Sequence, residues 1–358
     1  MGDNHNWHDP RPPAPPFSWV KDNANTVEKG PCAGYPSLPN SLPARPRVVV
    51  IGDIHGDMTM LLHLLIDVAK VIDDRGDWVA KPKSTVVIQL GDQIDSCRGP
   101  NCADEKDESS KANDLVILKF FTYLHMVAAK HDGGVYSLLG NHELMNVAGH
   151  FDYVSDKNKM VFDTFRPVDP KNKFKSPMER AIESRKSAFE RGGEWSKFLA
   201  CTRQSSITIG SWMFVHASIT DSVTQHYKSI DSLNTAVRTW LLSLIDQDDN
   251  IEHIIADPVE SPFWNRILGK MKPNEAAESC ADILSPLIDV YHMKHLVIAH
   301  TPQLLINGVG INSTCGKKVW RVDTGAAAAF NAFHKKTGKT AVPQVMEIID
   351  DTKVNILE

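Results

Sequence analysis

Five short apolar runs each end just before residues that can bind a metal ion, and this recurrence constrains the fold more than any other feature. The first three runs, 47–51, 85–90 and 134–139, alternate with segments of helical apolar spacing at 58–71 and 114–130. Alternating buried strands and helices predict a β-α-β-α-β unit with a parallel sheet. Ligands bind beyond the carboxyl ends of such strands, so the polar residues there are expected to meet at one edge.

The remaining runs lie in the second half of the chain. Residues 206–209 and 212–216 predict an antiparallel pair of strands joined by Gly210 and Ser211. Further strands are expected at 295–300, 319–322 and 345–349. Asp323, Thr324 and Gly325 are interpreted as a turn between the last two.

The domain organisation follows from where apolar patterning starts. Residues 1–45 are rich in Pro, Asn and Gly, which predicts an extended or disordered arm, or alternatively a proline-rich segment that docks a partner. No linker is evident after residue 46, so 46–358 is predicted to be a single catalytic domain. Helical inserts near 150–200 and 221–290 are expected to cover the site.

Composition excludes several classes of protein. A net charge of -5 without an extended basic stretch argues against nucleic acid as a partner. No apolar run reaches the roughly 18 residues that a membrane span needs. The N-terminus lacks the apolar run of a secretory signal. Six scattered cysteines predict reduced thiols in a cytoplasmic protein, and Cys97 and Cys102, which could pair or bind metal, are expected to be free.

The residues at the strand ends suit metal binding as a set. Alone, each has a simpler interpretation, since a strand-end Asp is often a helix cap and a strand-end His a satisfied polar group. Together they would require the same coincidence five times over, so a metal centre is the better hypothesis. The predicted ligands are Asp53, His55, Asp92, Asn141, His216 and His300.

A two-metal centre would explain this ligand set chemically. Two cations roughly 3.5–4 Å apart clamp a phosphate and lower the pKa of a shared water. No Ser or Cys with a partnered base is evident, so direct attack by metal-bound hydroxide is expected. His, Asp and Asn ligands suit Mn, Fe and Zn alike.

Five ordered motifs also resemble a known family. GDIHGD (52–57), GDQID (91–95), GNHE (140–143), the strand ending in His216, and AHTPQ (299–303) resemble the calcineurin-like metallophosphoesterases of the phosphoprotein phosphatase type. GNHELMNVAGHFDYVS (140–155) and SPFWNR (261–266) are most similar to Shewanella-like phosphatases. The resemblance implies an α/β (α+β four-layer) fold, with two mixed β-sheets packed as a central sandwich flanked by helices.

The resemblance also implies how the metal ligands divide. Asp53 and His55 would hold the first metal, and Asp92 would bridge both. The second metal would be completed by Asn141, His216 and His300.

Catalytic and substrate-binding roles follow from the same resemblance. His142, oriented by Asp95, would be the general acid or a phosphate ligand, and Arg266 would grip phosphate, with a surface salt bridge as its alternative role. The family usually has an Arg directly after Asp95; this chain has Ser96, and Arg98 comes two residues later. Arg98 reaches phosphate only if the loop bulges. The predicted substrate-binding residues are Arg266, Arg98 and Asn141.

The expected function is a dinuclear-metal phosphatase that acts on phosphomonoesters of phosphoproteins. The alternative is a hydrolase of dinucleoside polyphosphates or other small phosphate esters, because the same metal core serves both. A catalytically silent binding protein is the third hypothesis. It is disfavoured because His142 and every expected ligand are present.

Overall fold

The computed structural model describes residues 26–98, 111–165, 174, 176–246 and 249–358. One of its sheets is built on the predicted β-α-β-α-β unit. Strands β2, β3, β4 and β5 are neighbours and parallel, and β11 adds to β2 in antiparallel orientation. The order is β12 (Lys353–Leu357), β11 (Val345–Ile349), β2 (Arg47–Ile51), β3 (Val86–Gln89), β4 (Gly134–Leu138) and β5 (Arg203–Gln204).

The second sheet contains the strands that end in the later histidines. The predicted hairpin is confirmed, since β6 and β7 are antiparallel and turn at residues 210–211. Strand β8 is parallel to both β7 and β10. The order is β1 (Ser41–Leu42), β6 (Ser206–Ile209), β7 (Trp212–Val215), β8 (His295–Ile298), β10 (Val319–Arg321) and β9 (Asn312–Thr314).

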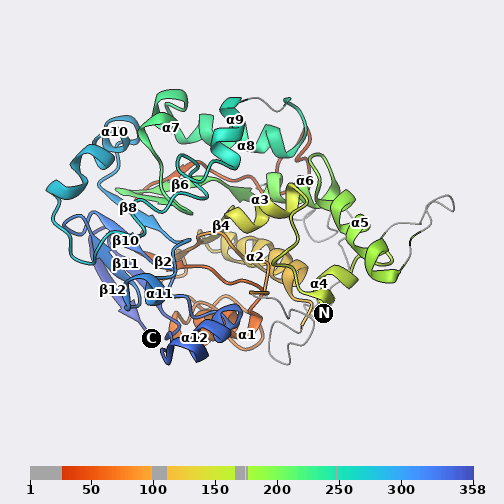
Figure 1. The fold of residues 1–358 in the computed structure, drawn as a ribbon. Helices are drawn as coiled ribbons and strands as arrows, with labels where there is room; N and C mark the ends of the chain where they lie inside the picture. The colour runs from red at the N-terminus through yellow and green to blue at the C-terminus, as the bar shows by residue number, and fades with distance from the viewer. Residues whose placement is uncertain (1–25, 99–110, 166–173, 175, 247–248) are drawn as a thin grey trace.

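The two sheets pack face to face and helices cover their outer faces. Val50 and Ile88 of one sheet share a buried cluster with Phe214 of the other, which forms the layer between the sheets. The opposite side chains of β2 and β3 pack against α1 (Met58–His63) and α2 (Asp114–Ala129). Figure 1 shows α1 on the side of the molecule away from α7–α10. The predicted sandwich of two mixed sheets flanked by helices is confirmed.

The first predicted helix differs in its second half. Residues 58–71 form α1 and then a π-helical turn, Leu64–Val68, in which Ala69 donates to the carbonyl of Leu64. The next helix agrees with prediction to within a residue.

Both predicted inserts are largely helical. The first contains α4 (Asp156–Met160), α5 (Pro177–Phe189) and α6 (Glu194–Thr202). The second contains α7 (Asp221–His226), α8 (Ile230–Leu241), α9 (Asp249–Ile255), a 3-10 turn (Glu278–Cys280) and α10 (Ala281–Tyr291). Around the site lie α3 (Asn141–Val147), α11 (Gln303–Asn307), the 3-10 turn Ala328–Phe330 and α12 (Asn331–Thr337).

Part of the predicted N-terminal arm packs on the domain. Strand β1 pairs with β6, and Thr26 forms a bridge with Pro36. Residues 1–25, which include the proline-rich segment, lie outside the described residues, so the arm and its boundary stay a prediction.

The cysteines in the described part of the chain are disulfide-bonded, so the expectation of reduced thiols is wrong for them. Cys32 is bonded to Cys201, and Cys280 to Cys315. Cys97 is also disulfide-bonded, whereas Cys102 lies outside the described residues. The partners are 169 and 35 residues apart, which is why spacing alone did not reveal them. The cytoplasmic prediction loses the support that free thiols gave it.

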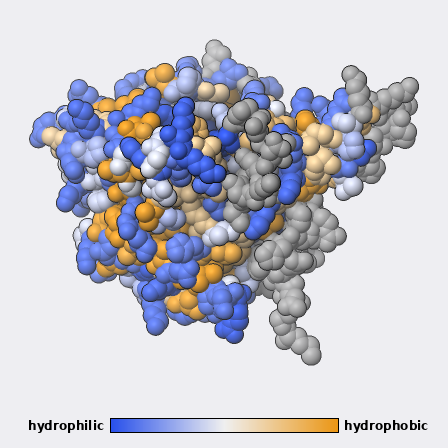
Figure 2. Space-filling view, turned by 60° about the horizontal axis from the view of Figure 1, so that its bottom comes forward, coloured by the Kyte–Doolittle hydropathy of each residue, from blue (hydrophilic) through white to orange (hydrophobic). Residues whose placement is uncertain are grey.

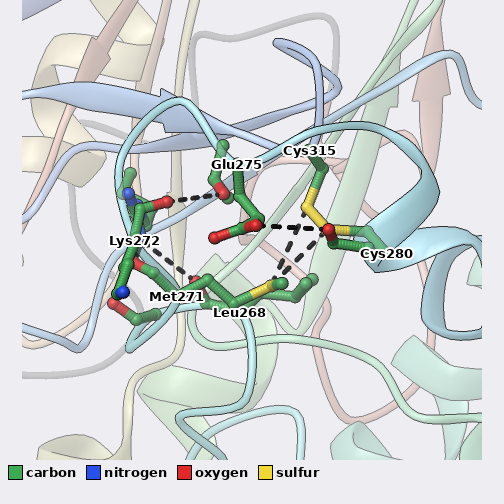
Figure 3. The surroundings of a disulfide bond; sticks show 10 residues. Leu268, Met271, Lys272, Glu275, Cys280 and Cys315 are labelled. Atoms are coloured by element: carbon green, nitrogen blue, oxygen red, sulfur yellow. Dashed lines mark hydrogen bonds between the residues drawn. A yellow bond between two sulfur atoms is a disulfide. The ribbon is translucent and has the colours of Figure 1, made fainter.

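The Cys280–Cys315 disulfide joins the helical insert to the second sheet (Figure 3). Cys280 leads into α10, and Cys315 directly follows β9. The Met271 sulfur lies 3.5 Å from that of Cys280, and Thr314 donates to the carbonyl of Lys272. The disulfide therefore ties the segment that follows Arg266 to the end of strand β9.

The surface carries scattered apolar side chains. Ile306, Phe333 and Val342 are exposed. Figure 2 brings the α12 side of the molecule forward and shows apolar patches interspersed with polar ones. No helix among the described residues is long and apolar enough to span a membrane.

Candidate metal centre

The predicted ligands all lie just beyond strand ends and are buried. Asp53 and His55 follow β2, Asp92 follows β3, and His216 and His300 follow β7 and β8. Three of them, together with Asp95, have positive φ angles, from 47° at His55 to 72° at Asp95. Such backbone is costly for residues with side chains and is concentrated at functional sites.

Close backbone packing explains two glycines of the motifs. Gly91 has a φ of 92°, and a Cβ there would lie 2.6 Å from the nitrogen of Gly140. At Gly140 a Cβ would collide with the Asp92 carboxylate. Glu143 ties the same loops together, because its carboxylate accepts from the backbone nitrogens of Asp92 (3.0 Å) and Gly140 (2.7 Å). The loops after β3 and β4 are thus held against each other.

Asp92 lies at the centre of the cluster. Its Oδ2 is 3.4 Å from His216 Nε2, 3.8 Å from His55 Nε2 and 3.9 Å from His142 Nε2. Burial raises the pKa of Asp92, but His216 and His142 outweigh it and hold the pKa well below its usual value. One carboxylate oxygen therefore faces histidines on two sides, as a bridging ligand would.

Two groups of residues in the described part of the chain have the spacing of a metal site, and they share Asp92. One is His55, Asp92 and His142; the other is Asp92, His216 and His300, each with ligand atoms within 4.8 Å of one another. Asn141 Oδ1 lies 3.1 Å from His216 Nε2 and joins the second group. His142 was predicted beside the metals rather than among their ligands, and it is equally close to Asp92.

A concentration of buried negative charge shows that cations fit this site. Burial, followed by the carboxylates of Asp323 and Asp92, raises the pKa of Asp53 well above its usual value. Asp323 Oδ2 is buried next to Asp53 and has no hydrogen-bond partner among the described residues. Three crowded carboxylates without a cation are unfavourable, and bound divalent metal would relieve their repulsion.

The histidines of the site differ in charge preference but are all oriented. Burial holds the pKa of both His55 and His300 well below the usual value, with Arg98 adding to the effect at His55, whereas the Asp92 carboxylate raises the pKa of His216 despite its burial. His216 Nδ1 contacts the carbonyl of Leu90 at 2.6 Å, and His300 Nε2 that of Trp264 at 2.8 Å. Each carbonyl fixes a tautomer and leaves the other ring nitrogen for a cation.

His142 and Asp95 form the predicted pair. His142 Nδ1 is 2.8 Å from Asp95 Oδ2, and both side chains are buried. Asn146 donates to both oxygens of Asp95, at 2.9 and 3.1 Å. The carboxylate accepts the Nδ1 proton, so Nε2 of His142 faces the centre.

Two arginines reach the site from opposite sides. Arg98 Nη2 is 2.9 Å from His55 Nδ1 and 3.1 Å from His142 Nε2, so the shifted arginine does enter the site. Its guanidinium lies over the rings of Tyr153 and Phe330, at 4.9 and 5.3 Å. Arg266 donates to the carbonyl of His300 at 2.7 Å. Arg266 has no ion pair within the described ranges, which disfavours a surface salt bridge.

A cavity of about 480 Å³ opens onto most of these polar residues. Its polar lining comprises Asp53, His55, Asp92, Arg98, Asn141, His142, Arg266 and His300. Its apolar and aromatic lining comprises Met145, Tyr153, Trp264, Pro302, Leu305, Phe330 and Phe333. The arrangement can bind a small anionic group against the polar residues and an apolar body against the others.

The family match agrees with this geometry. The model of the calcineurin-like phosphoesterases matches residues 46–304, most of the chain. The chain belongs to the calcineurin-like phosphoesterase family. Phosphoester hydrolysis and a metal centre thereby apply to it at the level of the family.

Two related proteins are similar to this phosphoesterase over most of its length. It is 40% identical over 256 residues to an uncharacterized protein, R398, of Acanthamoeba polyphaga mimivirus, covering 66% of this chain and 97% of that one. It is 25% identical over 337 residues to Shewanella-like protein phosphatase 2 of Arabidopsis thaliana, covering 87% and 77%. The predicted resemblance to Shewanella-like phosphatases is confirmed.

A solved structure confirms the fold. A cold-active protein tyrosine phosphatase superposes with a TM-score of 0.61 at 20% identity, covering 89% of this phosphoesterase and 80% of that chain. At this identity the likeness speaks for the fold alone.

Sequence reasoning missed several residues of the site. Asp323 was interpreted as part of a turn, although it lies two residues after the end of strand β10, the same signal that marked Asp53 two residues after β2. Tyr153 and Trp264 lay inside motifs that were recognised, but their place on the cavity wall depends on the tertiary fold. Glu143 was seen in GNHE without its role of tying the loops.

Proposed function

We propose that this phosphoesterase is a dinuclear-metal phosphatase that hydrolyses phosphomonoesters, with phosphoproteins as its substrates. The observation that carries the proposal is the position of Asp92, whose Oδ2 lies within 3.9 Å of three histidines from separate loops. Asp53 and His55 would hold one cation, and Asn141, His216 and His300 the other. Mn, Fe and Zn all suit these ligands.

When bound, the cations supply a nucleophilic water and neutralise the phosphate charge. The chain's own residues provide the remaining functions. Arg98 and Arg266 reach the cavity from opposite sides and would hold phosphate oxygens. His142 presents Nε2 to the cavity while the Asp95 carboxylate accepts a hydrogen bond from Nδ1 and stabilises the doubly protonated ring, so that the protonated His142 would donate its Nε2 proton to the departing oxygen and become neutral.

The aromatic walls suit a substrate with an apolar part next to its phosphate. Tyr153, Trp264 and Phe333 line the cavity together with the polar groups. A side chain of a phosphoprotein would contact these rings when its phosphate lies against the polar groups. The polar contacts that a second nucleotide would need are not evident among the described wall residues, which makes dinucleoside polyphosphates the second candidate.

Partners and location are proposals of lower rank. A docking role for the proline-rich segment falls on residues 1–25, outside the described ranges. A cytoplasmic location is left without its main argument, because the described cysteines are disulfide-bonded.

A substrate panel tests the proposed function. Protein with Mn²⁺ is offered phosphoserine, phosphothreonine and phosphotyrosine peptides, 4-nitrophenyl phosphate and a dinucleoside tetraphosphate. We expect turnover of phosphopeptides that a chelator abolishes and Mn²⁺ restores. Asp92→Asn should lower kcat by about 10³-fold or more, because it weakens both cation sites.

Asp67→Asn is the matched control, since Asp67 is exposed and pairs with His63 at the surface. It should keep wild-type activity. Turnover of the dinucleoside tetraphosphate alone would favour the second candidate. No turnover of any ester with metal present would refute both.

A further inference from the structure

Arg185 is a fully buried arginine of α5 that lies outside the cavity but connects to its base. We propose that Arg185 is a positioning residue for His142, acting through Asn146 and Asp95. The inference rests on the proposed function and adds to it that the first helical insert helps to build the catalytic pair. None of the roles assigned above includes this side chain.

The guanidinium of Arg185 is held on three sides. Its Nε donates to Asn146 Oδ1 at 2.9 Å and its Nη2 to Asp114 Oδ2 at 3.1 Å. Its Nη1 donates to the carbonyl of Asn158 at 3.1 Å. A planar fork with fixed partners cannot rotate, so its donor toward Asn146 has one direction.

Arg185, together with Asp95 and the carbonyl of His142, fixes which way the Asn146 amide faces. A guanidinium only donates, so the amide oxygen must point to Arg185. The amide nitrogen then faces Asp95, whose carboxylate only accepts, and it also donates to the carbonyl of His142 at 2.9 Å. Without Arg185, the buried amide oxygen would lose its only donor among the described residues, and the Asn146 side chain would be free to shift away from Asp95.

Asp95 in turn fixes the orientation of His142. With Asn146 bound to both of its oxygens, Asp95 keeps Oδ2 2.8 Å from His142 Nδ1. Asp114 closes the network, because its Oδ1 accepts from the backbone nitrogen of Asp95 at 3.2 Å. The direction of His142 Nε2 therefore depends on a chain of contacts that begins on α5.

The burial of Arg185 makes the network rigid. Its guanidinium lies 4.9 Å from the ring of Phe189 and 5.3 Å from that of Phe162. A buried charge is costly unless it is paired and hydrogen-bonded, and here the guanidinium pairs with Asp114 and each of its three nitrogens donates a hydrogen bond. A purely structural ion pair with Asp114 would also explain the burial. The test must separate positioning from stability.

The dependence of kcat/KM on the leaving group separates a positioning role from a purely structural one. Proton donation by His142 matters for an alkyl ester such as a phosphoserine peptide, whose leaving oxygen is strongly basic, and little for 4-nitrophenyl phosphate. We compare kcat/KM on both esters for wild type, Arg185→Met and Arg185→Lys. The ratio of the two rates on one preparation does not depend on the folded fraction, so partial misfolding does not mimic the effect.

We expect Arg185→Met to slow the phosphoserine peptide about 10-fold or more beyond its effect on 4-nitrophenyl phosphate. Arg185→Lys, which keeps the charge and a single donor nitrogen but not the planar fork, should restore part of the ratio. Arg180→Met on the same helix, where Arg180 pairs with Asp163 at 2.6 Å, should leave the ratio unchanged. If Arg185→Met yields no folded protein, Asn146→Leu interrupts the same chain and should shift the ratio likewise.

Equal slowing of both esters in Arg185→Met and Asn146→Leu would overturn the inference and leave the proposed function intact. A wild-type protein that hydrolyses neither ester would overturn the proposed function, and the inference with it.

Discussion

At the scale of single residues, Arg98 shows how a change in sequence register is absorbed. Ser96 stands where the family usually has its arginine and is buried. Arg98 nevertheless enters the cavity, because Nη1 donates to the carbonyls of Asp95 and Cys97 and the rings of Tyr153 and Phe330 flank the guanidinium. The disulfide of Cys97 anchors the chain immediately before it.

Removing the guanidinium of Arg98 should weaken substrate binding more than chemistry. Bonds from a charged donor to phosphate contribute about 1.5–3 kcal/mol, so Arg98→Ala should raise KM roughly 10- to 100-fold. Steady-state kinetics on a phosphopeptide measure the effect. The KM of Arg98→Lys should lie between those of wild type and Arg98→Ala. Arg75→Ala, at an exposed site, should have the KM of wild type. An unchanged KM in Arg98→Ala would remove Arg98 from the phosphate site.

At the scale of elements, strand ends do most of the positioning. Asp92 and His216 belong to different sheets, yet they come within 3.4 Å because both sheets of the sandwich present strand ends at the same edge. The two helical inserts supply further residues. Arg185 lies on α5 of the first insert, and Arg266 precedes α10 in the second insert.

The Cys280–Cys315 disulfide, which joins the insert near 221–290 to strand β9, should contribute to the free energy of unfolding. It closes a loop of 35 residues, for which the chain-entropy estimate is about 4 kcal/mol. The double variant Cys280→Ser with Cys315→Ser should lose free energy of unfolding of that order in urea denaturation. Ser279→Ala, in the same exposed segment, is the control and should unfold like wild type. Equal unfolding midpoints for wild type with and without reductant would contradict the bond's role.

At the scale of the whole molecule, the sheets and ligands could be predicted because their signals are local. An apolar β-branched run such as Val48–Ile51 followed by Gly-Asp can be recognised within a few residues. Strand β12 was missed because it is a half-exposed edge strand that alternates polar and apolar residues after a tight turn at Asp350 and Asp351.

The supporting interactions could not be predicted because they join distant residues. Arg185 and Asp114 are 71 positions apart, and each looks like an ordinary helical surface charge in the sequence. The Cys32–Cys201 bond spans 169 residues, and nothing near either cysteine indicates its partner. Local patterns reveal where a strand ends, while the tertiary fold decides which buried charge supports which ligand.

The central claim is that Asp92 is shared by two cations, and metal stoichiometry tests it most directly. Purified wild-type protein and Asp92→Asn are loaded with Mn²⁺, freed of excess metal, and analysed by elemental mass spectrometry alongside circular dichroism to verify folding. We expect two cations per folded wild-type chain and fewer than one in Asp92→Asn. Two cations retained by folded Asp92→Asn, or no tightly bound metal in wild type, would contradict it.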